Sequence, residues 1–200
     1  MKIKSLKVVA ATTDISNLIQ EMTLYESING YIKGSINILD GTNFYDEVIG
    51  AHDALVPIKV TFIYGATDLV EVPHYFMIDG IINQKITKTE KTYTMQLISP
   101  VEQGLKLTKL LEVYRGKSTN IAKKIFVDCM EKGSKLLVDT IAVTNGKYIV
   151  PNILAAQAMA NVVDHAVDAD GAGFYLYQRV WDKGATRMTS VKTMSTDFFI

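Results

Sequence analysis

The sequence feature that most constrains the fold is a change of hydrophobic period near residue 100. Between Leu18 and Ser99, apolar and polar residues mostly alternate, which is typical of strands with one buried and one polar face. After Pro100, apolar residues recur at helical spacing. The change predicts an antiparallel β region followed by a region of mixed helix and strand.

The first region carries the signals of about five or six strands, enough for a small barrel or a strongly curled sheet. Asn29-Gly30 lies between two alternating runs and predicts a hairpin turn, and Thr42–Val48 predicts a short helix. A second hairpin is expected from His74–Lys88 and Lys91–Ser99 around Thr89-Glu90. The residues expected to face the core are Ile32, Gly34, Ile36 and Ile38, then Ile58, Val60, Phe62 and Tyr64, then Tyr93, Met95 and Leu97.

The second region begins with one helix and a short strand. Ser118 is the expected N-cap of the helix, and Gly133 is placed to end it. Lys135–Val143 is predicted to be a short strand and Asn145-Gly146 a turn. The apolar stripe of the helix is expected to consist of Ile121, Ala122, Ile125, Phe126, Cys129 and Met130.

A second helix is predicted after Asn152, its expected N-cap, and Asp170–Gly173 should break it. Phe174–Val180 and Arg187–Met194 then predict a hairpin across Asp182-Lys183-Gly184. The expected apolar side of the helix is Ile153, Ala156, Met159, Ala160, Val163 and Val167. The fold class is therefore α+β, with a curled antiparallel sheet or barrel over residues 1–112 and a smaller mixed α/β domain over 113–200.

Composition narrows the classes of function. The chain has 200 residues with 21 Lys and Arg against 21 Asp and Glu, so its formal net charge is zero. A protein whose main task is to bind a nucleic-acid backbone normally carries an excess of basic residues. A chain with no net charge is also prone to associate with its own copies. Cys129 is the single cysteine, which excludes an intrachain disulfide and a cysteine-based zinc site.

Two apolar runs are the candidates for a targeting or membrane segment. Val8–Ala11 is too short for a signal peptide, and Ile153–Val163 is too short and too polar to span a bilayer. We therefore expect a product made in the cytoplasm, without a membrane anchor.

Three short motifs resemble catalytic or metal sites and lack part of the pattern. Gly116-Lys117-Ser118-Thr119 resembles the end of a phosphate-binding loop, but Leu111 stands where that loop needs glycine. Asp168–Gly171 has its glycine at the wrong position for a calcium loop and is better read as a turn. Asp164, His165 and Asp168 could touch a metal, although acids at a helix C-terminus oppose its dipole.

No signature of nucleophilic catalysis accompanies the histidines. His52, His74 and His165 are scattered, and the sequence contains no Gly-x-Ser-x-Gly elbow. The sequence predicts no catalytic, cofactor or metal site.

One charged segment is a candidate interaction surface. Residues 104–135 hold 8 basic residues against 3 acidic ones. The segment is either a solvated helix face or a surface that meets an acidic partner or passing nucleic acid. The candidate residues are Lys106, Lys109, Arg115, Lys117, Lys123 and Lys124.

The order of these parts resembles the baseplate (tail) hub proteins of contractile-tailed phages, and the related hub-spike proteins of contractile injection systems. The resemblance is carried by Thr23–Gly34, Ile36–Asp40, Val56–Val60, Tyr75–Gly80, Leu97–Pro100, Ile149–Asn152 and Gly173–Tyr177. Family members are longer and carry a second tube domain, so the resemblance predicts a truncated or split hub with an incomplete second domain.

The resemblance implies a tail-tube-like β domain and a structural role in the virion. Such hubs are trimers that join the tail tube to the central spike and contact other baseplate proteins, and DNA or tape-measure protein passes through their lumen. It implies no catalysis and no cofactor. A polar sheet face with Asn83, Lys85, Thr87, Thr92, Thr94 and Gln96 would suit a wet lumen, or simply solvent. The alternatives are an adaptor of a type VI-like injection machine and, in another class, a small phage cell-wall hydrolase.

Overall fold

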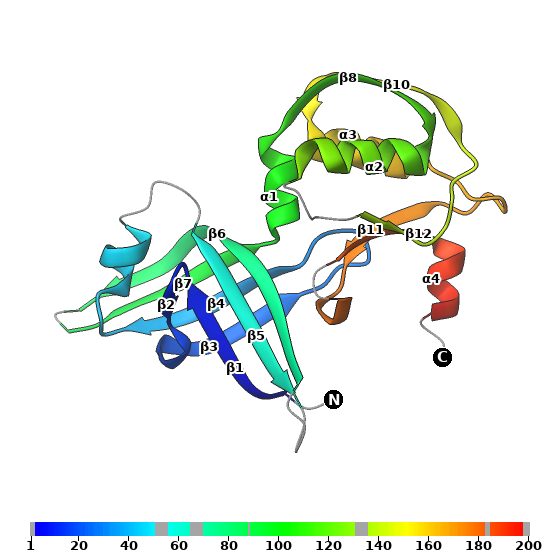
Figure 1. The fold of residues 1–200 in the computed structure, drawn as a ribbon. Coiled ribbons are helices and arrows are strands. Elements are labelled where there is room, and N and C mark those ends of the chain that lie inside the picture. The colour runs from blue at the N-terminus through cyan, green and yellow to red at the C-terminus, as the bar shows by residue number, and fades with distance from the viewer. Residues whose placement is uncertain are drawn as a thin grey trace. The chain divides into compact units, whose positions relative to one another are not determined.

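The computed structural model describes residues 3–50, 56–64, 70–87, 89–130, 136–182 and 185–197. Two compact units divide the chain: residues 1–25 with 32–100, and residues 26–31 with 101–200. Figure 1 shows the elements of both units along the chain. Within the described ranges, no helix is long and apolar enough to cross a membrane. The domain boundaries predicted from the sequence, 1–112 and 113–200, remain a prediction.

The first unit is a curled, fully antiparallel seven-stranded sheet with the order β2-β1-β5-β6-β7-β4-β3. Two short helical turns, η1 (Ser16–Leu18) and η2 (Tyr45–Ile49), join its strands. The strands are β1 (Ile3–Ala10), β2 (Thr13–Asp14), β3 (Ile19–Tyr25), β4 (Lys33–Asp40), β5 (Pro57–Tyr64), β6 (Val70–Ile86) and β7 (Lys91–Ile98). The fold class expected from the alternating pattern is confirmed.

Alternation sets which face of this sheet is buried. Ile36 and Ile38 of β4, Ile58 and Val60 of β5 and Met95 of β7 are all almost inaccessible to solvent. These side chains stand at every second position, so one face becomes an apolar core while the intervening residues stay polar. The core residues predicted from the sequence are confirmed, with Gly34 buried among them.

The strand β6 bends where its pairing with β7 shifts register, between Ile78 and Gly80 and again between Ile82 and Lys85. Asn83 adopts a left-handed conformation with φ of 55° in the second irregularity. Bulges of this kind bend a strand and increase its twist, which accounts for the curl of the sheet.

The predicted hairpin around Asn29-Gly30 is confirmed, because β3 pairs antiparallel with β4 on either side of it. β3 ends at Tyr25 and β4 begins at Lys33, so the connection is longer than a two-residue turn. Its residues belong to the second unit, where the Gln178 amide donates to the Gly30 carbonyl at 3.2 Å. A tertiary partner, and not the local turn preference of Asn-Gly, determines the path of this segment. The predicted hairpin of β6 and β7 is confirmed, with Thr87 donating to Glu90 across the connection.

The second unit surrounds a hydrophobic cluster with helices, a two-stranded ribbon and a three-stranded sheet. The helices are α1 (Pro100–Leu107), α2 (Ser118–Cys129), α3 (Ala155–Asp164) and α4 (Val191–Asp197), with the short turn η3 (Val180–Asp182). The strands β8 (Lys109–Lys117) and β10 (Asn145–Leu154) pair with each other, and β9 (Leu136–Val138), β11 (Phe174–Gln178) and β12 (Thr186–Ser190) form the sheet β11-β12-β9. Ile125, Phe126, Met159 and Val150 are among the most buried members of the cluster.

Several local predictions in this unit are confirmed. Ile121, Ala122, Ile125 and Phe126 form the buried stripe of α2, with Cys129 and Met130 half-buried beyond them. Phe174–Gln178 and Thr186–Ser190 form the predicted hairpin, and each strand ends earlier than expected: the first because η3 begins at Val180 and the second because α4 begins at Val191. The helix-ending role of Gly133, and most of the turn at Asp182-Lys183-Gly184, lie outside the described residues.

Three predictions in the same unit are wrong, and one is confirmed in part. Asn145-Gly146 is not a turn, because both residues are paired in β10. The short strand predicted over Lys135–Val143 is present, but in the part of the chain that the structure describes it covers Leu136–Val138 alone. Ser118 is the first residue of α2, and Lys117 takes the N-cap position without a side-chain hydrogen bond. Asn152 lies in a bulge of β10 with φ of 52°, and Leu154 precedes α3.

The apolar side of α3 is also shifted in phase from the predicted one. Ala155, Ala158 and Val162 are buried, whereas Ala160 is exposed. Met159 and Val163 are buried as predicted. The helix starts three residues after Asn152, so the sequence pattern alone placed its beginning too early.

Candidate interaction surfaces

The polar face of the first unit is the first candidate surface. Across β3, β4 and β7, the Asn37 amide donates to the Glu21 carboxylate at 3.1 Å, and the Thr94 hydroxyl donates to the Asn37 side-chain oxygen at 2.8 Å. These three residues are paired in register, so the hydrogen bonds tie three neighbouring strands together. We define the polar sheet face by Glu21, Ser35, Asn37, Lys85, Thr92, Thr94 and Gln96.

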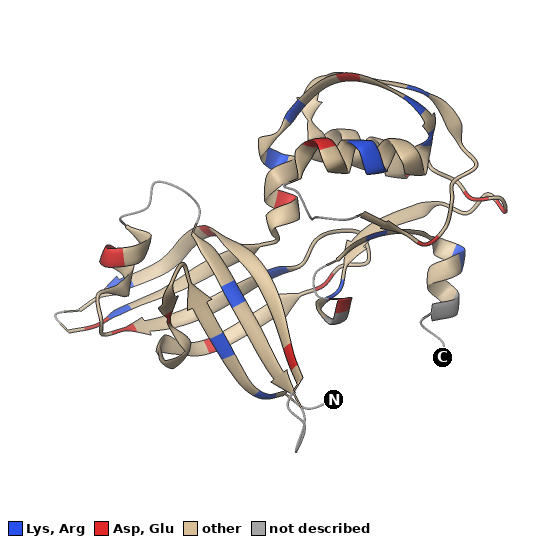
Figure 2. Ribbon diagram, viewed as in Figure 1, with Lys and Arg blue, Asp and Glu red and all other residues tan. Residues whose placement is uncertain are grey.

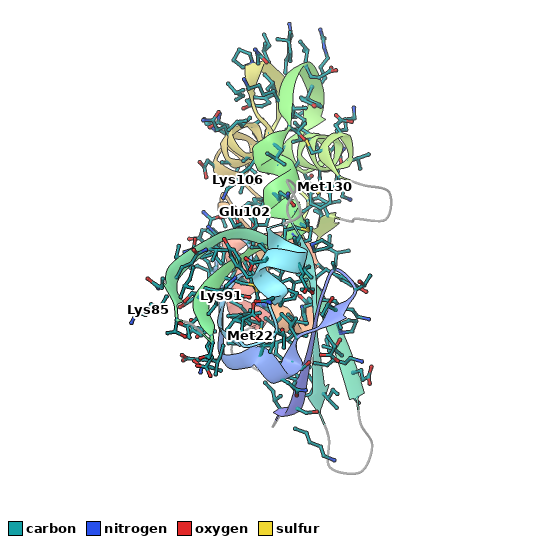
Figure 3. The ribbon with its side chains drawn as sticks, turned by 90° about the vertical axis from the view of Figure 1, so that its left-hand side faces the viewer. Met22, Lys85, Lys91, Glu102, Lys106 and Met130 are labelled. Carbon is teal, nitrogen blue, oxygen red and sulfur yellow. The ribbon has the colours of Figure 1, made fainter. Side chains whose placement is uncertain are left out.

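Of the residues predicted to line a lumen, Lys85 and Thr92 face each other in register, and Gln96 lies opposite Gly80. Asn83, Lys85 and Thr87 are exposed, while Thr92 and Thr94 are half-buried. Lys91, at the start of β7, pairs with Asp46 and lies over the ring of Tyr45 (Figure 3). The surface is thus rich in hydroxyl and amide groups, and its charges are few.

His74 lies within the core of the same sheet. It is 2% exposed, its ring stacks against Phe76, and Phe62 meets it edge-on. No described residue accepts or donates a hydrogen bond at its Nε2. Burial lowers the pKa of His74, because the charged imidazolium would lose its hydration in this apolar setting.

The second candidate surface is the ribbon of β8 and β10, which arches over α2 and α3 (Figure 1). Its inner face joins the hydrophobic cluster through Leu110, Tyr114 and Val150. The Tyr114 hydroxyl donates to the Asp128 carboxylate at 3.0 Å, which fastens the ribbon to α2. Burial raises the pKa of Tyr114, and the hydrogen bond to Asp128 and its negative charge act in the same direction.

All six basic residues predicted to contact a partner are exposed, but they lie on three elements. Lys109, Arg115 and Lys117 belong to β8, and Lys123 and Lys124 belong to α2.

The sixth residue, Lys106, lies on α1 and pairs with the nearly buried Glu102 at 2.7 Å (Figure 3). A further cation, Lys147 of β10, stands opposite Arg115 and was missed by the sequence analysis. The cross-strand register is the signal that identifies it.

The motifs that resembled chemical sites have structural explanations. The Asp168 carboxylate accepts hydrogen bonds from the Asp170 and Ala172 amides, both at 2.9 Å, so the predicted turn is confirmed. His165 Nδ1 lies 2.7 Å from the Asn161 carbonyl oxygen. Among the described residues, no group of three or more His, Cys, Asp or Glu is placed to hold a metal ion.

Cys129 is half-buried at the end of α2. Burial, reinforced by the charge of Asp128, raises the pKa of its thiol to about 11. The thiol is therefore protonated at neutral pH, which disfavours nucleophilic chemistry there.

No protein-family model matches the sequence, and no curated protein matches it. Solved structures do match. A 43 kDa tail protein of prophage MuSo2 from Shewanella oneidensis is 12% identical with a TM-score of 0.59, and the match covers 92% of this chain and 53% of that one.

Two further structures match over nearly the whole of this chain. The E. coli c3393 protein is described as a component of the type VI secretion system with structural similarity to the T4 bacteriophage tail proteins gp27 and gp5. It is 11% identical with a TM-score of 0.59, covering 96% of this chain and 49% of that one. A Francisella PdpA-VgrG complex gives 8% identity and a TM-score of 0.58, covering 98% of this chain and 34% of that one.

The chain thus spans about half the length, or less, of the structures it matches. The agreement follows the chain through both compact units, because each match covers more than nine-tenths of it. The resemblance predicted from the order of strands and helices is confirmed at the level of fold: the chain is similar in structure to phage tail proteins, to a type VI secretion component and to a PdpA-VgrG complex.

Proposed function

We propose that this chain is a structural protein of a phage tail or a related secretion machine, and within it a baseplate hub that joins the tail tube to the central spike. The observation that carries the proposal is the fold. A curled seven-stranded sheet followed by a mixed α/β unit matches tail and type VI proteins over 92–98% of this chain. Its place of action is the virion, after synthesis in the host cytoplasm.

The open edges of the sheet support assembly from several copies, which we propose to be a homotrimer. In the described part of the chain, β3 pairs with β4 alone, and β2 covers only Val9 and Ala10 of β1. Unpaired strand edges attract further strands and need to be covered. Pairing of β1 in one copy with β3 in the next would cover both edges and produce a ring.

The polar sheet face supports the proposed channel lining. Some of its polar groups are hydrogen-bonded to one another, in the Glu21–Asn37–Thr94 ladder. Phosphate backbones bind mainly to clustered Lys and Arg, so a surface with few cations lets DNA or tape-measure protein pass without holding it. Tail tube, spike and other baseplate proteins are the proposed lasting partners.

Sedimentation of the purified chain, alone and with the spike protein of the same machine, tests the assembly. We expect a species of three times the 22.2 kDa chain mass. For the edges, we would introduce Ser5→Cys and Glu21→Cys in a Cys129→Ser background and add a short bis-maleimide. Covalent trimers should form, whereas Thr89→Cys in place of Glu21→Cys should give none. A chain that stays monomeric at high concentration and with spike protein contradicts the hub.

A hub or adaptor of an injection machine remains the alternative within the same class, and neighbouring genes for tube, sheath and effector proteins distinguish the two. A cell-wall hydrolase is the alternative in another class. Here the triple variant of Asp164, His165 and Asp168 is compared with the unmodified chain in a peptidoglycan turnover assay. We expect no turnover from either protein, and turnover that the triple variant loses would favour the enzyme.

A further inference from the structure

The ribbon of β8 and β10 has an outer face that the hydrophobic cluster does not use. Seven of its residue pairs continue without interruption from Asn145↔Lys117 to Pro151↔Leu111, and the irregularity beside Asn152 follows them. Alternate residues turn away from α2 and α3. We call these the outer ribbon face: Lys109, Leu111, Val113, Arg115 and Lys117 of β8, with Asn145, Lys147, Ile149 and Pro151 of β10.

The middle of this face is apolar and exposed. Leu111 is 75% exposed, Val113 51% and Ile149 58%. Val113 stands directly opposite Ile149, and Leu111 directly opposite Pro151, so the four side chains form one patch. Single exposed apolar residues are common on protein surfaces, but contiguous groups on a sheet face mark sites where another molecule binds.

One end of the patch is strongly basic. Arg115 stands opposite Lys147, and Lys117 follows after one glycine, while Lys109 lies at the other end of β8. Glu112, on the alternate face, is the one acidic residue of the two strands. These four cations make no ion pair with any described residue. Figure 2 shows basic segments toward both ends of the ribbon.

The pairing of Arg115 with Lys147 is unfavourable for the isolated chain. Like charges directly opposite each other destabilise an antiparallel pair, and nothing in the described part of the chain offsets this repulsion. Carboxylates supplied from outside would turn the same arrangement into favourable ion pairs. The charge pattern therefore favours binding of an acidic ligand next to the apolar patch.

The ribbon also offers backbone groups to such a ligand. β8 and β10 form a sheet of their own, and in the described residues neither has a second strand partner. An extended segment can add to an open edge through main-chain hydrogen bonds. Its alternate side chains then contact the neighbouring surface, which determines the sequence preference.

We propose that the outer ribbon face binds an extended segment of a partner protein in which apolar residues are followed by aspartate or glutamate at alternate positions. Valine- or leucine-like side chains would cover Leu111, Val113 and Ile149, and the carboxylates would meet Arg115, Lys147 and Lys117. This binding surface belongs to the second unit alone and holds with or without the hub assignment.

Other occupants fit the face less well. A second copy of this chain, related by twofold symmetry, would bring the same cations against one another. A nucleic acid would place phosphates along the whole ribbon, but its centre offers Leu111 and Val113 in place of cations. An anionic membrane could use both parts of the face, and the experiment below separates it from a protein segment.

The test uses the full chain and a short fluorescein-labelled peptide with valine, valine, glutamate and glutamate at alternate positions, separated by threonine. Fluorescence anisotropy should show saturable binding that weakens with added salt. Hydrogen–deuterium exchange should slow in β8 and β10 when the peptide is added. The variant Arg115→Glu/Lys147→Glu should bind this peptide at least about tenfold more weakly and should gain binding to the matching lysine peptide.

The variant Leu111→Ser/Val113→Ser/Ile149→Ser should also lose at least about tenfold in affinity, because the apolar contact is removed. Lys7→Glu/Lys59→Glu is the matched control: it makes the same change of charge at exposed positions of β1 and β5 and should bind as the unmodified chain does. Circular dichroism confirms that each variant is folded.

Three results would overturn the proposal. The first is the absence of saturable binding up to about 1 mM peptide. A Kd of about 1 mM corresponds to a binding free energy of only about 4 kcal/mol. The second is equal binding of the glutamate and lysine peptides by the unmodified chain. The third is binding of phosphatidylglycerol vesicles or duplex DNA, lost in the Arg115→Glu/Lys147→Glu variant, without binding of the peptide.

Discussion

His74 should make the stability of the sheet depend on pH below neutrality. Its ring is enclosed by Phe62 and Phe76 and is 2% exposed, and burial holds its pKa below the usual value. In the unfolded chain a histidine titrates near about 6.5. The unfolded state therefore binds a proton at His74 more tightly than the folded state does, so acid favours unfolding.

The size of the effect follows from this difference. Above about pH 7 the ring is neutral in both states and contributes no pH dependence. Below about pH 6.5, each further pH unit removes up to about 1.4 kcal/mol from the free energy of unfolding, until the folded-state pKa is reached. Between pH 7.5 and 5.5 the loss due to His74 is thus at most about 1.4 kcal/mol.

The perturbation is His74→Phe, which keeps an aromatic ring between Phe62 and Phe76 and cannot be protonated. Urea-dependent hydrogen–deuterium exchange of peptides from β5 and β6 reports unfolding of the sheet itself. We expect this variant to lose less free energy of unfolding than the unmodified chain between pH 7.5 and 5.5, by up to about 1.4 kcal/mol. His165→Gln is the control, because it removes an exposed histidine and keeps His74. If His74→Phe shows the same acid loss as the unmodified chain, the reasoning is refuted.

Three further predictions concern packing, a loop and the domain boundary. Gly34→Ala should lower the free energy of unfolding by about 1–3 kcal/mol in urea titrations, because the new Cβ would lie 2.7 Å from Leu24 Cδ2 and 3.0 Å from the Thr23 carbonyl oxygen. Gly41→Ala meets no atom within 4 Å and should cost little. Asp40→Ala should cost about 1–3 kcal/mol, because three backbone amides of the following loop lose their acceptor. Burial raises the pKa of Asp40, but those hydrogen bonds together lower it by more, so the net pKa is below the usual value. The contribution of Asp40 to the free energy of unfolding should therefore be present above about pH 4 and lost as acid protonates the carboxylate. Limited proteolysis read by mass spectrometry tests the predicted domains: fragments 1–112 and 113–200 support them, and cleavage beside Pro100 contradicts them.

The strand pattern of the first unit could be predicted because the information is local. In Pro57–Tyr64, every second residue from Ile58 is apolar, and each of these apolar side chains is buried as that period predicts. The buried stripe of α2 was predictable for the same reason. The candidate basic residues were also visible in the sequence, since charge is a property of each residue.

The β8–β10 ribbon was not predictable in this way. Leu110 and Leu111 are adjacent and equally apolar, yet Leu110 is buried in the cluster and Leu111 is 75% exposed. The strand partner of both lies beyond α2, near Ile153 and Pro151. A pairing over that distance depends on α2 and α3 packing beneath the ribbon, which no local pattern encodes.

The sequence by itself determined the class of fold, the balance of charge and the buried faces of the regular elements, because periodicity and composition are local properties. The tertiary structure alone decided where the connection after Tyr25 goes, that Asn145-Gly146 extends a strand, and that Arg115 faces Lys147 beside an apolar patch. These features arise from contacts between segments far apart in the chain, and such contacts are fixed by the packing of the whole unit.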